Sequence, residues 1–216
     1  MPWKLVKYIT VNGVLTCKSG LRIGGSKDQV GIGEMDNPII RHPLTKHPYV
    51  PGSSLKGKLR SLSEYREGKV PDSGQPHGCT DTTCMVCRVF GPHKVTDHGH
   101  GPTRLIVRDA QLMPESEKQL VETQAQGLNF AEIKSENWID RNTGIAGRGG
   151  LRTQERVPAG TKFALAMSVR IFDRDDEAKI VNFLKQALDA LPHDTLGSSG
   201  TRGYGWVELE YKIGQG

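Results

Sequence analysis

The sequence predicts an α+β domain, because three consecutive segments switch between the hydrophobic period of a strand and that of a helix. Residues 163–171 place an apolar side chain at every second position, which is typical of a half-buried strand. Residues 181–191 repeat apolar side chains at helical spacing, and Pro192 ends that pattern. Residues 207–213 alternate again. Strand, helix and strand in this order predict a mixed fold with a helix packed on a sheet.

The N-terminal half repeats this plan. Residues 3–16 predict a first strand, in which Asn12-Gly13 indicates a bulge or turn. Residues 20–52 are rich in glycine and proline and predict a long, shaped loop, and residues 53–66 predict a helix with a leucine stripe. A strand restarts at Leu105. Without its insertions, this order resembles the split strand–helix–strand plan of ferredoxin-like domains.

Two further segments predict insertions into one domain. Residues 68–102 form an irregular stretch without an apolar period, and residues 114–160 are polar and spotted with glycine. Within the second stretch, residues 131–140 and 151–157 predict the arms of an exposed hairpin. A chain of 216 residues suits one domain with insertions.

The composition narrows the class of partner. A formal charge of +5 and a pI near 9.0 favour a polyanion, and 6% aromatic residues argue against an extended base-stacking platform. We expect a cytoplasmic protein without membrane contact. No apolar run approaches the roughly 20 residues that cross a bilayer, and the N-terminus lacks the order of a signal peptide.

A histidine and three cysteines within residues 77–87 predict a metal site. His77, Cys79, Cys84 and Cys87 match the ligand set of a closed tetrahedral zinc site, which would be structural and would staple the otherwise coreless insertion at residues 68–102. This spacing suits one metal better than two disulfides. Two alternatives stay open, a redox pair at Cys84 and Cys87, and a different histidine as fourth ligand. The other candidate histidines are His93, His98 and His100.

Cys17 has a separate interpretation. It lies in a predicted strand, where a cysteine is more often a small buried apolar residue than a reactive thiol.

The start of the first predicted helix combines a cap with positive charge. Ser53 or Ser54 can cap the helix, and Lys56 and Arg60 lie one turn apart beside the leucine stripe. A helix start that faces solvent favours an anion such as a phosphate. The segment therefore predicts a grip on a nucleic-acid backbone, with an ordinary solvated basic face as the alternative.

The loop at residues 197–205 is dense in glycine, which lets backbone amides approach a phosphate closely, and Arg202 adds a charge-assisted contact. It is not a nucleoside-triphosphate loop, because it follows a helix and enters a strand and lacks the Lys-Ser or Lys-Thr ending. A flexible turn is the alternative.

Asp36 lies in the long loop together with Asp28, Arg22, Arg41 and His42. An acid among cations can hold a divalent metal on a scissile phosphate or help to deprotonate an RNA 2′-hydroxyl. The alternative is a turn-forming Asp before Asn-Pro.

Together these motifs resemble the repeated backbone subunit of type III CRISPR effector complexes, a Csm-type member of the RAMP superfamily. The resemblance covers nearly the whole chain. It rests on residues 21–25, 35–38 and 51–60, the His-Cys-Cys-Cys set, and residues 136–141, 151–158 and 200–205.

The resemblance implies a single RAMP domain over residues 1–216, with a modified RRM-like palm, a zinc-containing insertion at 68–102 and a protruding thumb hairpin at 131–160. It implies copies of the chain stacked in a helical filament on a guide CRISPR RNA, together with other type III effector subunits. Complementary target RNA would be cut at regular intervals beside nucleotides that the thumb displaces. Asp36 would be catalytic, with Mg²⁺ or another divalent cation, and the 2′-hydroxyl would attack to leave a cyclic phosphate.

The resemblance also assigns roles to further residues. The family usually has His where this chain has Arg22, and arginine does not exchange protons near neutrality, so a phosphate clamp is expected there. Trp138 and Ile139 lie near the thumb tip, where Trp138 would wedge against bases or fill a surface or packing role. Other acids that match the family pattern are Asp109, Glu132, Glu136 and Glu155, of which the last two would brace the thumb or assist cleavage. The expected guide contacts are Ser54, Lys56, Lys58, Arg60, Gly200, Arg202 and Gly203.

Two alternatives to a guided nuclease remain within the same superfamily. One is an RNA-binding scaffold without catalysis, and the other is a nuclease that processes precursor guide RNA. A zinc hydrolase unrelated to RNA is a more distant alternative, which a fully protein-ligated zinc would exclude.

Overall fold

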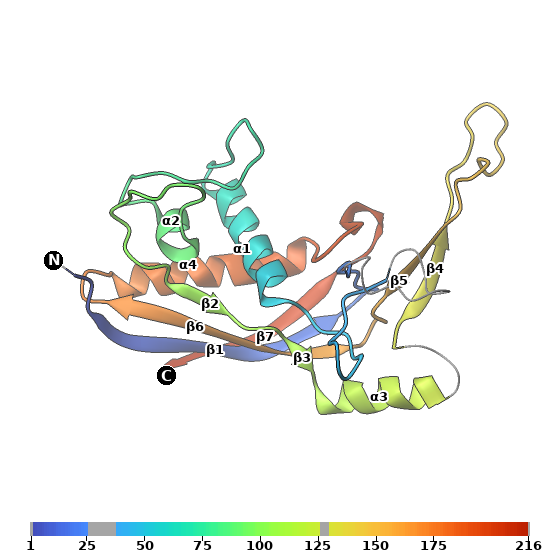
Figure 1. The fold of residues 1–216 in the computed structure, drawn as a ribbon, viewed down its shortest axis with the longest axis horizontal. Helices are drawn as coiled ribbons and strands as arrows, with labels where there is room; N and C mark the ends of the chain where they lie inside the picture. The colour runs from blue at the N-terminus through green and yellow to red at the C-terminus, as the bar shows by residue number, and fades with distance from the viewer. Residues whose placement is uncertain (1, 26–37, 126–129, 216) are drawn as a thin grey trace.

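A five-stranded antiparallel sheet organises the chain, and the computed structural model describes residues 2–25, 38–125 and 130–215 (Figure 1). Strands β1 (Leu5–Cys17) and β6 (Lys162–Phe172) form its central ladder. Strand β7 (Val207–Gln215) pairs with the other edge of β1, while β2 (Leu105–Val107) and β3 (Gln111–Leu112) both pair with β6. The spatial order is therefore β2-β6-β1-β7.

The register of β1 on β6 places most of the buried apolar side chains of both strands on one face. Val11 lies opposite Met167 and Leu15 lies opposite Phe163, and each of these side chains is at most 2% exposed. Because side chains alternate across a strand, a slip of one residue would expose the whole set. The predicted strand at residues 163–171 is confirmed, and its apolar side chains belong to the hydrophobic core.

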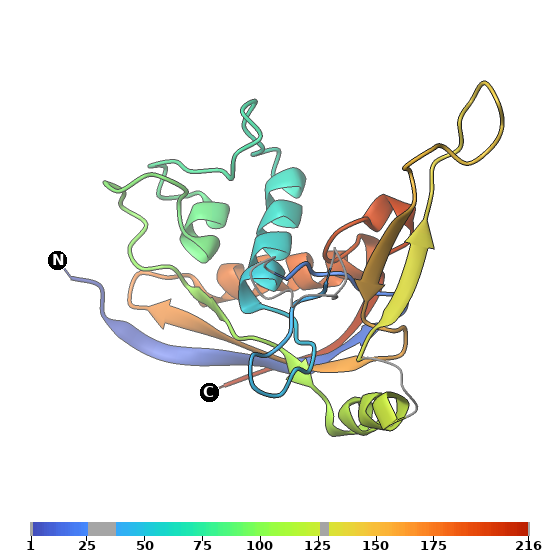
Figure 2. The same cartoon turned by 45° about the vertical axis from the view of Figure 1, so that its right-hand side comes forward.

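Two long helices cover that face (Figures 1 and 2). Helix α1 (Gly52–Arg66) follows β1, and α4 (Glu177–Ala190) follows β6 and continues into a 3-10 turn, η2 (Leu191–His193). Leu55, Leu59 and Leu188 are 0% exposed between the helices and the sheet. Each helix connects two strands of the sheet, as the split strand–helix–strand plan requires, and the α+β fold class is confirmed.

The prediction of a bulge or turn at Asn12-Gly13 is wrong. Both residues continue the ladder, with Asn12 opposite Ala166 and Gly13 opposite Leu165. The glycine is needed for another reason, since a Cβ there would lie 2.1 Å from the carbonyl oxygen of Glu210 on β7. Gly13 thus permits close approach of two strands.

Helix α3 (Pro114–Ala125) was not predicted from the sequence. It lies on the opposite side of the sheet from α1 and α4 in both ribbon views (Figures 1 and 2). Among its described side chains only Ser116 and Leu120 are buried, so it lacks the apolar stripe from which a helix is recognised.

The insertion at residues 68–102 contains helix α2 (Met85–Phe90) and is not coreless, contrary to the sequence-based expectation. Val86 and Val89 are 0% exposed and belong to the same cluster as the sheet residues. Phe90 meets Phe183 of α4 edge to face, with ring centroids 6.4 Å apart. The insertion therefore shares the main core.

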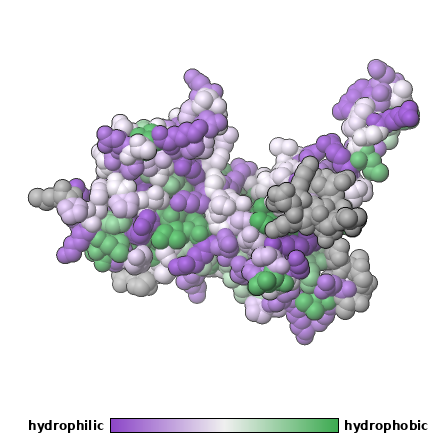
Figure 3. All heavy atoms as spheres, viewed as in Figure 1, coloured by the Kyte–Doolittle hydropathy of each residue, from purple (hydrophilic) through white to green (hydrophobic). Residues whose placement is uncertain are grey.

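Strands β4 (Glu132–Glu136) and β5 (Arg152–Arg156) form a separate two-stranded ladder, shorter than the expected arms at 131–140 and 151–157. It projects away from the sheet, and its surface in Figure 3 is mainly hydrophilic with small apolar patches. None of the helices in the described ranges is long and apolar enough to cross a membrane.

Candidate functional site

Asp36, the expected catalytic residue, lies outside the described residues, but the two segments that flank it pair with each other. The Gly25 N–H donates to the Pro38 carbonyl oxygen at 3.1 Å, and the Ile40 N–H donates to the Ile23 carbonyl oxygen at 2.8 Å. Gly25 and Pro38, the described residues on either side of this segment, therefore lie next to each other.

Glu155 on β5 holds the segment that follows Asp36. Its Oε2 accepts the Ile39 N–H at 3.1 Å and Arg41 Nη1 at 2.7 Å, and its Oε1 accepts Arg41 Nη2 at 3.3 Å. Glu155 is 5% exposed, so this paired, bidentate contact is shielded from water. Both carboxylate oxygens are engaged, which supports the bracing role for Glu155.

Arg22 lies where the long loop meets the glycine-rich loop. Its Nη1 donates to Ser198 Oγ at 2.9 Å, and its carbonyl oxygen accepts the Ser198 N–H at 2.8 Å. A Cβ on Gly197, which has φ +81°, would lie 2.3 Å from the Arg22 carbonyl oxygen. Glycine is therefore required for these loops to pack together.

The glycine-rich loop contains a 3-10 turn, η3 (Gly200–Arg202), and Gly203 after it has φ +86°. Arg202 donates from Nη2 to Ser199 Oγ at 2.7 Å, and its Nη1 lies 3.5 Å from Glu136 Oε2. Its side chain is 47% exposed. Arg202 thus faces both the hairpin and solvent.

Glu136, at the end of β4, gathers several partners from the loop and its own strand. The Tyr204 hydroxyl donates to Glu136 Oε1 at 2.7 Å, and Lys134 Nζ lies 3.4 Å from the same oxygen. The Tyr204 hydrogen bond is the main cause that lowers the pKa of Glu136, and the cations Lys134 and Arg202 lower it further. Burial, followed by the bond to Glu136, raises the pKa of Tyr204.

Glu132, at the other end of β4, forms an ion pair with Arg156, which lies opposite it on β5. The carboxylates of Glu132 and Glu136 therefore make contacts at the two ends of β4. Neither contact involves the segments that flank Asp36.

Three cations of α1 that were expected to contact RNA, Lys56, Lys58 and Arg60, all contact protein groups. Lys56 Nζ donates to the Leu105 carbonyl oxygen at 3.2 Å, and Lys58 Nζ lies 3.0 Å from Asp194 Oδ1. Desolvation, and then the charges of Arg60 and Arg170, lower the pKa of Lys56. The basic cluster is therefore dense, and its members are held in place by the protein.

The cap of α1 differs from the prediction. Neither Ser53 nor Ser54 caps the helix, which begins at Gly52 after Pro51. The Gly52 N–H instead donates to Asp109 Oδ1 at 2.7 Å. A Cβ on Gly52 would lie 2.6 Å from the Val107 carbonyl oxygen, so the helix start packs against the chain after β2. The expectation that it faces solvent is wrong, and Asp109 supplies the anion there.

His77, Cys79, Cys84 and Cys87 come together, with one candidate ligand atom from each within 4.8 Å of the others. Cys79 Sγ and Cys87 Sγ are 3.7 Å apart, and Cys84 Sγ is 3.6 Å from His77 Nε2. A tetrahedral zinc site requires about 3.8 Å between sulfurs and about 3.5 Å between sulfur and nitrogen. The residues fit a four-ligand metal site. In the described part of the chain, no other such group of three or more is found.

Burial adjusts the protonation of this cluster. It raises the pKa of the Cys87 thiol to about 12 and is the main cause that lowers the pKa of His77. The lowered pKa favours His77 as a neutral ligand, whereas Cys87 requires a cation to stabilise its thiolate.

The other histidines lie outside the ligand group. His100 is 0% exposed and its Nε2 lies 2.8 Å from the Cys79 carbonyl oxygen, while the His98 ring centroid is 5.4 Å from that of His100. The His93 N–H donates to the His77 carbonyl oxygen at 3.2 Å. Among the described residues, His77 is therefore the histidine that completes the set.

Trp138 packs within the loop of the hairpin. A Cβ on Gly147 or on Gly150 would lie 2.3 Å from its indole, and its carbonyl oxygen accepts the Gly147 N–H at 2.8 Å. Trp138 is 44% exposed and Ile139 is 51% exposed. The packing role expected for Trp138 is present, and part of its ring still faces solvent.

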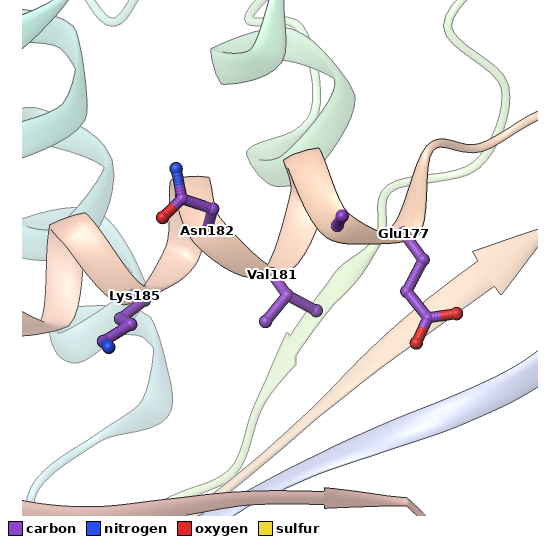
Figure 4. A pocket seen from close by; sticks show the side chains of 5 residues that line it. Glu177, Val181, Asn182 and Lys185 are labelled. Atoms are coloured by element: carbon purple, nitrogen blue, oxygen red, sulfur yellow. The ribbon is translucent and has the colours of Figure 1, made fainter.

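A shallow pocket on α4 lies apart from these motifs. Glu177, Val181 and Lys185 recur every four residues and point to the same side of the helix, while Asn182 points away from them (Figure 4). It contains none of the residues expected from the sequence to bind RNA or metal.

Sequence reasoning missed one residue of the site, Glu64, and the contact made by another, Arg41, which was named only as a cation in the loop of Asp36. Glu64 is 6% exposed and accepts the His77 N–H, and Arg41 grips Glu155. The four-residue spacing of Arg60 and Glu64 was a usable signal for a helical ion pair. For Arg41 no local signal existed, because its partner lies 114 positions away.

Comparison with models of known protein families identifies the superfamily of this chain. The family model of the RAMP superfamily matches residues 14–208. The chain belongs to the RAMP superfamily.

Within that class, the chain is similar to proteins named CRISPR system Cms endoribonuclease Csm3. The protein from Methanocaldococcus jannaschii is 39% identical over 205 residues, which cover 93% of this chain and 78% of the relative. The protein from Methanothermobacter thermautotrophicus is 41% identical, with 94% and 84% covered. The Streptococcus thermophilus protein is 34% identical, with 94% and 87% covered.

A solved structure shows the same relationship. The chain matches a protein in the crystal structure of a Csm3-Csm4 subcomplex of the type III-A CRISPR-Cas interference complex. The TM-score is 0.62 at 26% identity, and the match covers 98% of this chain and 82% of the other.

Proposed function

We propose that this chain is the repeated subunit of a type III CRISPR complex, where it binds guide RNA and cleaves complementary target RNA. The similarity over nearly the whole chain to endoribonucleases named Csm3 carries this proposal. The local geometry supports it, because the segments that flank Asp36, the glycine-rich loop and the base of the hairpin are in mutual contact. The proposed partners are the guide RNA, the target RNA, further copies of the chain and other effector subunits.

The guide is held mainly through its backbone in this proposal. Lys56, Lys58, Arg60 and Arg202 carry the positive charge, with Ser54, Gly200 and Gly203 beside them. Phosphate contacts carry no sequence information, so base pairing between guide and target supplies the specificity. Affinity for unrelated RNAs should then fall steeply with salt and vary little with sequence.

Cleavage is assigned to Asp36, with Arg22 as a phosphate clamp. The target 2′-oxygen forms the new bond to phosphorus and gives its proton to a base, while the bond to the 5′-oxygen breaks and that oxygen takes a proton from water to leave as a 5′-hydroxyl. A divalent cation such as Mg²⁺, held by Asp36, would supply positive charge at the phosphate. The hairpin at residues 131–160 serves as the thumb that displaces a target nucleotide, with Trp138 and Ile139 near its tip.

The metal at the cysteine cluster is proposed to be structural zinc. Four protein ligands fill a tetrahedral shell and leave no position for a substrate. The cluster then anchors the insertion at residues 68–102, and the chemistry of cleavage takes place elsewhere.

A target with one 2′-deoxynucleotide tests the proposed chemistry. The complex is assembled on a guide and given end-labelled target RNA, either unmodified or with a deoxynucleotide on the 5′ side of one cleavage site. We expect that one cut to disappear while the other cuts persist, and the remaining 5′ products to end in a cyclic phosphate. Cleavage at the deoxynucleotide would contradict the mechanism without contradicting the binding function.

A scaffold without catalysis is the second candidate. It is favoured by one observation, that Asp109, Glu136 and Glu155 all accept hydrogen bonds from protein groups and so have structural roles. Protection of target RNA without any cuts would establish the scaffold. A precursor-processing nuclease is less consistent with the site, because Arg22 does not exchange protons near neutrality.

A further inference from the structure

Three groups form a closed set of hydrogen bonds between α1 and the metal cluster. Glu64 Oε1 accepts Arg60 Nε at 2.7 Å and the His77 N–H at 2.9 Å. Arg60 Nη2 donates in turn to the His77 carbonyl oxygen. One turn of α1 therefore holds both backbone polar groups of His77, the residue whose imidazole belongs to the metal cluster.

This set is shielded from water. The side chains of Arg60 and Glu64 are 16% and 8% exposed. Hydrogen bonds between an ionised donor and acceptor are shorter and stronger than neutral ones, and burial limits their exchange with solvent. The position of Glu64 thus determines where both the guanidinium group of Arg60 and the backbone of His77 lie.

The two groups that Glu64 holds belong to different sites. His77 Nε2 lies 3.6 Å from Cys84 Sγ, inside the metal cluster. Arg60 lies one turn from Lys56 in the basic cluster of α1, close enough for its charge to disfavour the protonated form of Lys56. Groups that hydrogen-bond to metal ligands fix the orientation of those ligands and typically contribute 10- to 100-fold in metal affinity.

We propose that Glu64 is a positioning residue that couples the metal cluster to the RNA-binding face of α1. It holds His77 for the metal and Arg60 for a phosphate, so occupancy of either site raises the affinity of the other. The part of this inference that concerns RNA rests on the proposed RNA-binding function, and the part that concerns the metal does not. Such coupling is reciprocal, because the free energy of the doubly occupied state does not depend on the order of binding.

Removal of the metal leaves His77 with fewer restraints. In addition to the hydrogen bonds that His77 makes with Arg60 and Glu64, its carbonyl oxygen accepts the His93 N–H at 3.2 Å. Without the bond from metal to imidazole, this segment of the insertion rests on hydrogen bonds alone, and Arg60 loses a fixed partner. A cationic side chain that becomes ordered only when RNA binds loses more conformational entropy than one that is already held in place.

Zinc release from the full-length, zinc-loaded chain tests the metal half. A colorimetric chelator in excess reports the release rate. We expect Glu64→Ala to release zinc about tenfold faster than the wild type, and Glu64→Gln to fall between them. Glu67→Ala is the matched control, because it removes the same charge from the end of α1 but its partner is the exposed Arg66. It should release zinc at the wild-type rate.

Affinity for a labelled single-stranded RNA tests the other half. The wild type is compared with and without zinc, and we expect the zinc-loaded form to bind about fivefold tighter. In Glu64→Gln, which keeps the hydrogen-bond acceptor but not its charge, this ratio should shrink. In Glu67→Ala it should persist. Circular dichroism confirms that each variant is folded.

The outcomes separate the two proposals. Wild-type release rates from folded Glu64→Ala and Glu64→Gln, or a freshly purified protein without zinc, would overturn the inference. Equal RNA affinity with and without zinc would overturn the coupling. A wild type that binds no RNA in either state would overturn the proposed function and the RNA half together, and faster zinc release from Glu64→Ala would still establish the metal half.

Discussion

The hydroxyl group of Tyr204 donates a hydrogen bond to Glu136 Oε1 at 2.7 Å and so joins the glycine-rich loop to strand β4 of the hairpin. Tyr204 is 0% exposed, and its ring lies within 4.6 Å of Lys134 Nζ. The Glu136 side chain is 13% exposed. The angle between the hairpin and the sheet thus depends on a shielded, charge-assisted contact.

Tyr204→Phe removes this contact and little else. We expect a loss of about 1 to 2 kcal/mol in the free energy of unfolding, because the Glu136 carboxylate loses a donor in a shielded position. Urea denaturation measures the loss, and hydrogen exchange should show faster exchange in β4 and β5. An unchanged midpoint and unchanged exchange would mean that the hairpin is held by other contacts.

The same pair predicts a dependence on pH. The pKa of Glu136 is lowered in the folded protein, mainly by the Tyr204 hydroxyl. Its contribution to stability is therefore present above its ordinary pKa of 4.5 and is lost as the pH falls through the folded value. Wild type should be more stable than Glu136→Gln at pH 7, and the difference should vanish at low pH. A difference that is constant with pH would contradict the assignment.

Much of this architecture could be predicted because the signals are local. The alternation at residues 163–171 and the ligands between His77 and Cys87 follow from spacing within a few residues. Helix α3 escaped prediction because Leu120 is its one buried large apolar side chain among those described. A helix recognised by periodicity needs an apolar stripe.

Long-range contacts explain the other differences. The cap of α1 comes from Asp109, which is 57 residues beyond Gly52. Arg60 was assigned to RNA alone, because nothing in its neighbourhood in the sequence shows that the His77 backbone lies beside it. The kinds of group that a residue can bind could be predicted from its type, whereas the partner that each charged side chain contacts depends on the fold.

The buried pair of Arg104 and Asp175 should make a large contribution to stability. Both side chains are 0% exposed, and Arg104 Nη2 lies 2.6 Å from Asp175 Oδ1. Arg104→Met leaves a buried carboxylate without its main partner, and we expect a loss of about 3 to 5 kcal/mol. Thermal and chemical unfolding would measure it.

Lys179→Met provides the comparison for that variant. It removes an exposed cation near Asp176, and the change should stay within about 0.5 kcal/mol. Similar losses from both substitutions would show that the buried pair is not special.

The four cysteines should differ in their reaction with iodoacetamide. Cys17 is 1% exposed and burial raises the pKa of its thiol to about 12, so it should resist alkylation in the folded chain. With zinc bound, the three cluster cysteines should also be protected. A chelator should expose Cys79, which is only partly buried, and denaturant should then expose Cys84, Cys87 and Cys17, which are at most 3% exposed. Mass spectrometry counts the modified thiols, and alkylation of Cys17 before denaturation would contradict its burial.

Lys58→Ala should weaken RNA binding without altering sequence preference. Its charge lies on α1, where Asp194 orients it at 3.0 Å. Loss of one phosphate contact should reduce the slope of log affinity against log salt by about 1. Lys118→Ala on α3 is the control, since that side chain is 79% exposed on the opposite side of the sheet. An unchanged salt slope for Lys58→Ala would remove α1 from the RNA interface.

The cleavage of end-labelled target RNA by assembled complexes tests the central claim most directly. Complexes contain wild-type, Asp36→Ala or Asp28→Ala subunits, each with Mg²⁺ or EDTA, and the Asp28 variant controls for loss of an acid in the same loop. We predict evenly spaced cuts with Mg²⁺ for wild type and Asp28→Ala, none for Asp36→Ala despite full assembly, and none in EDTA. Evenly spaced cuts by the Asp36→Ala complex would contradict the account, because catalysis would then belong to another residue or subunit.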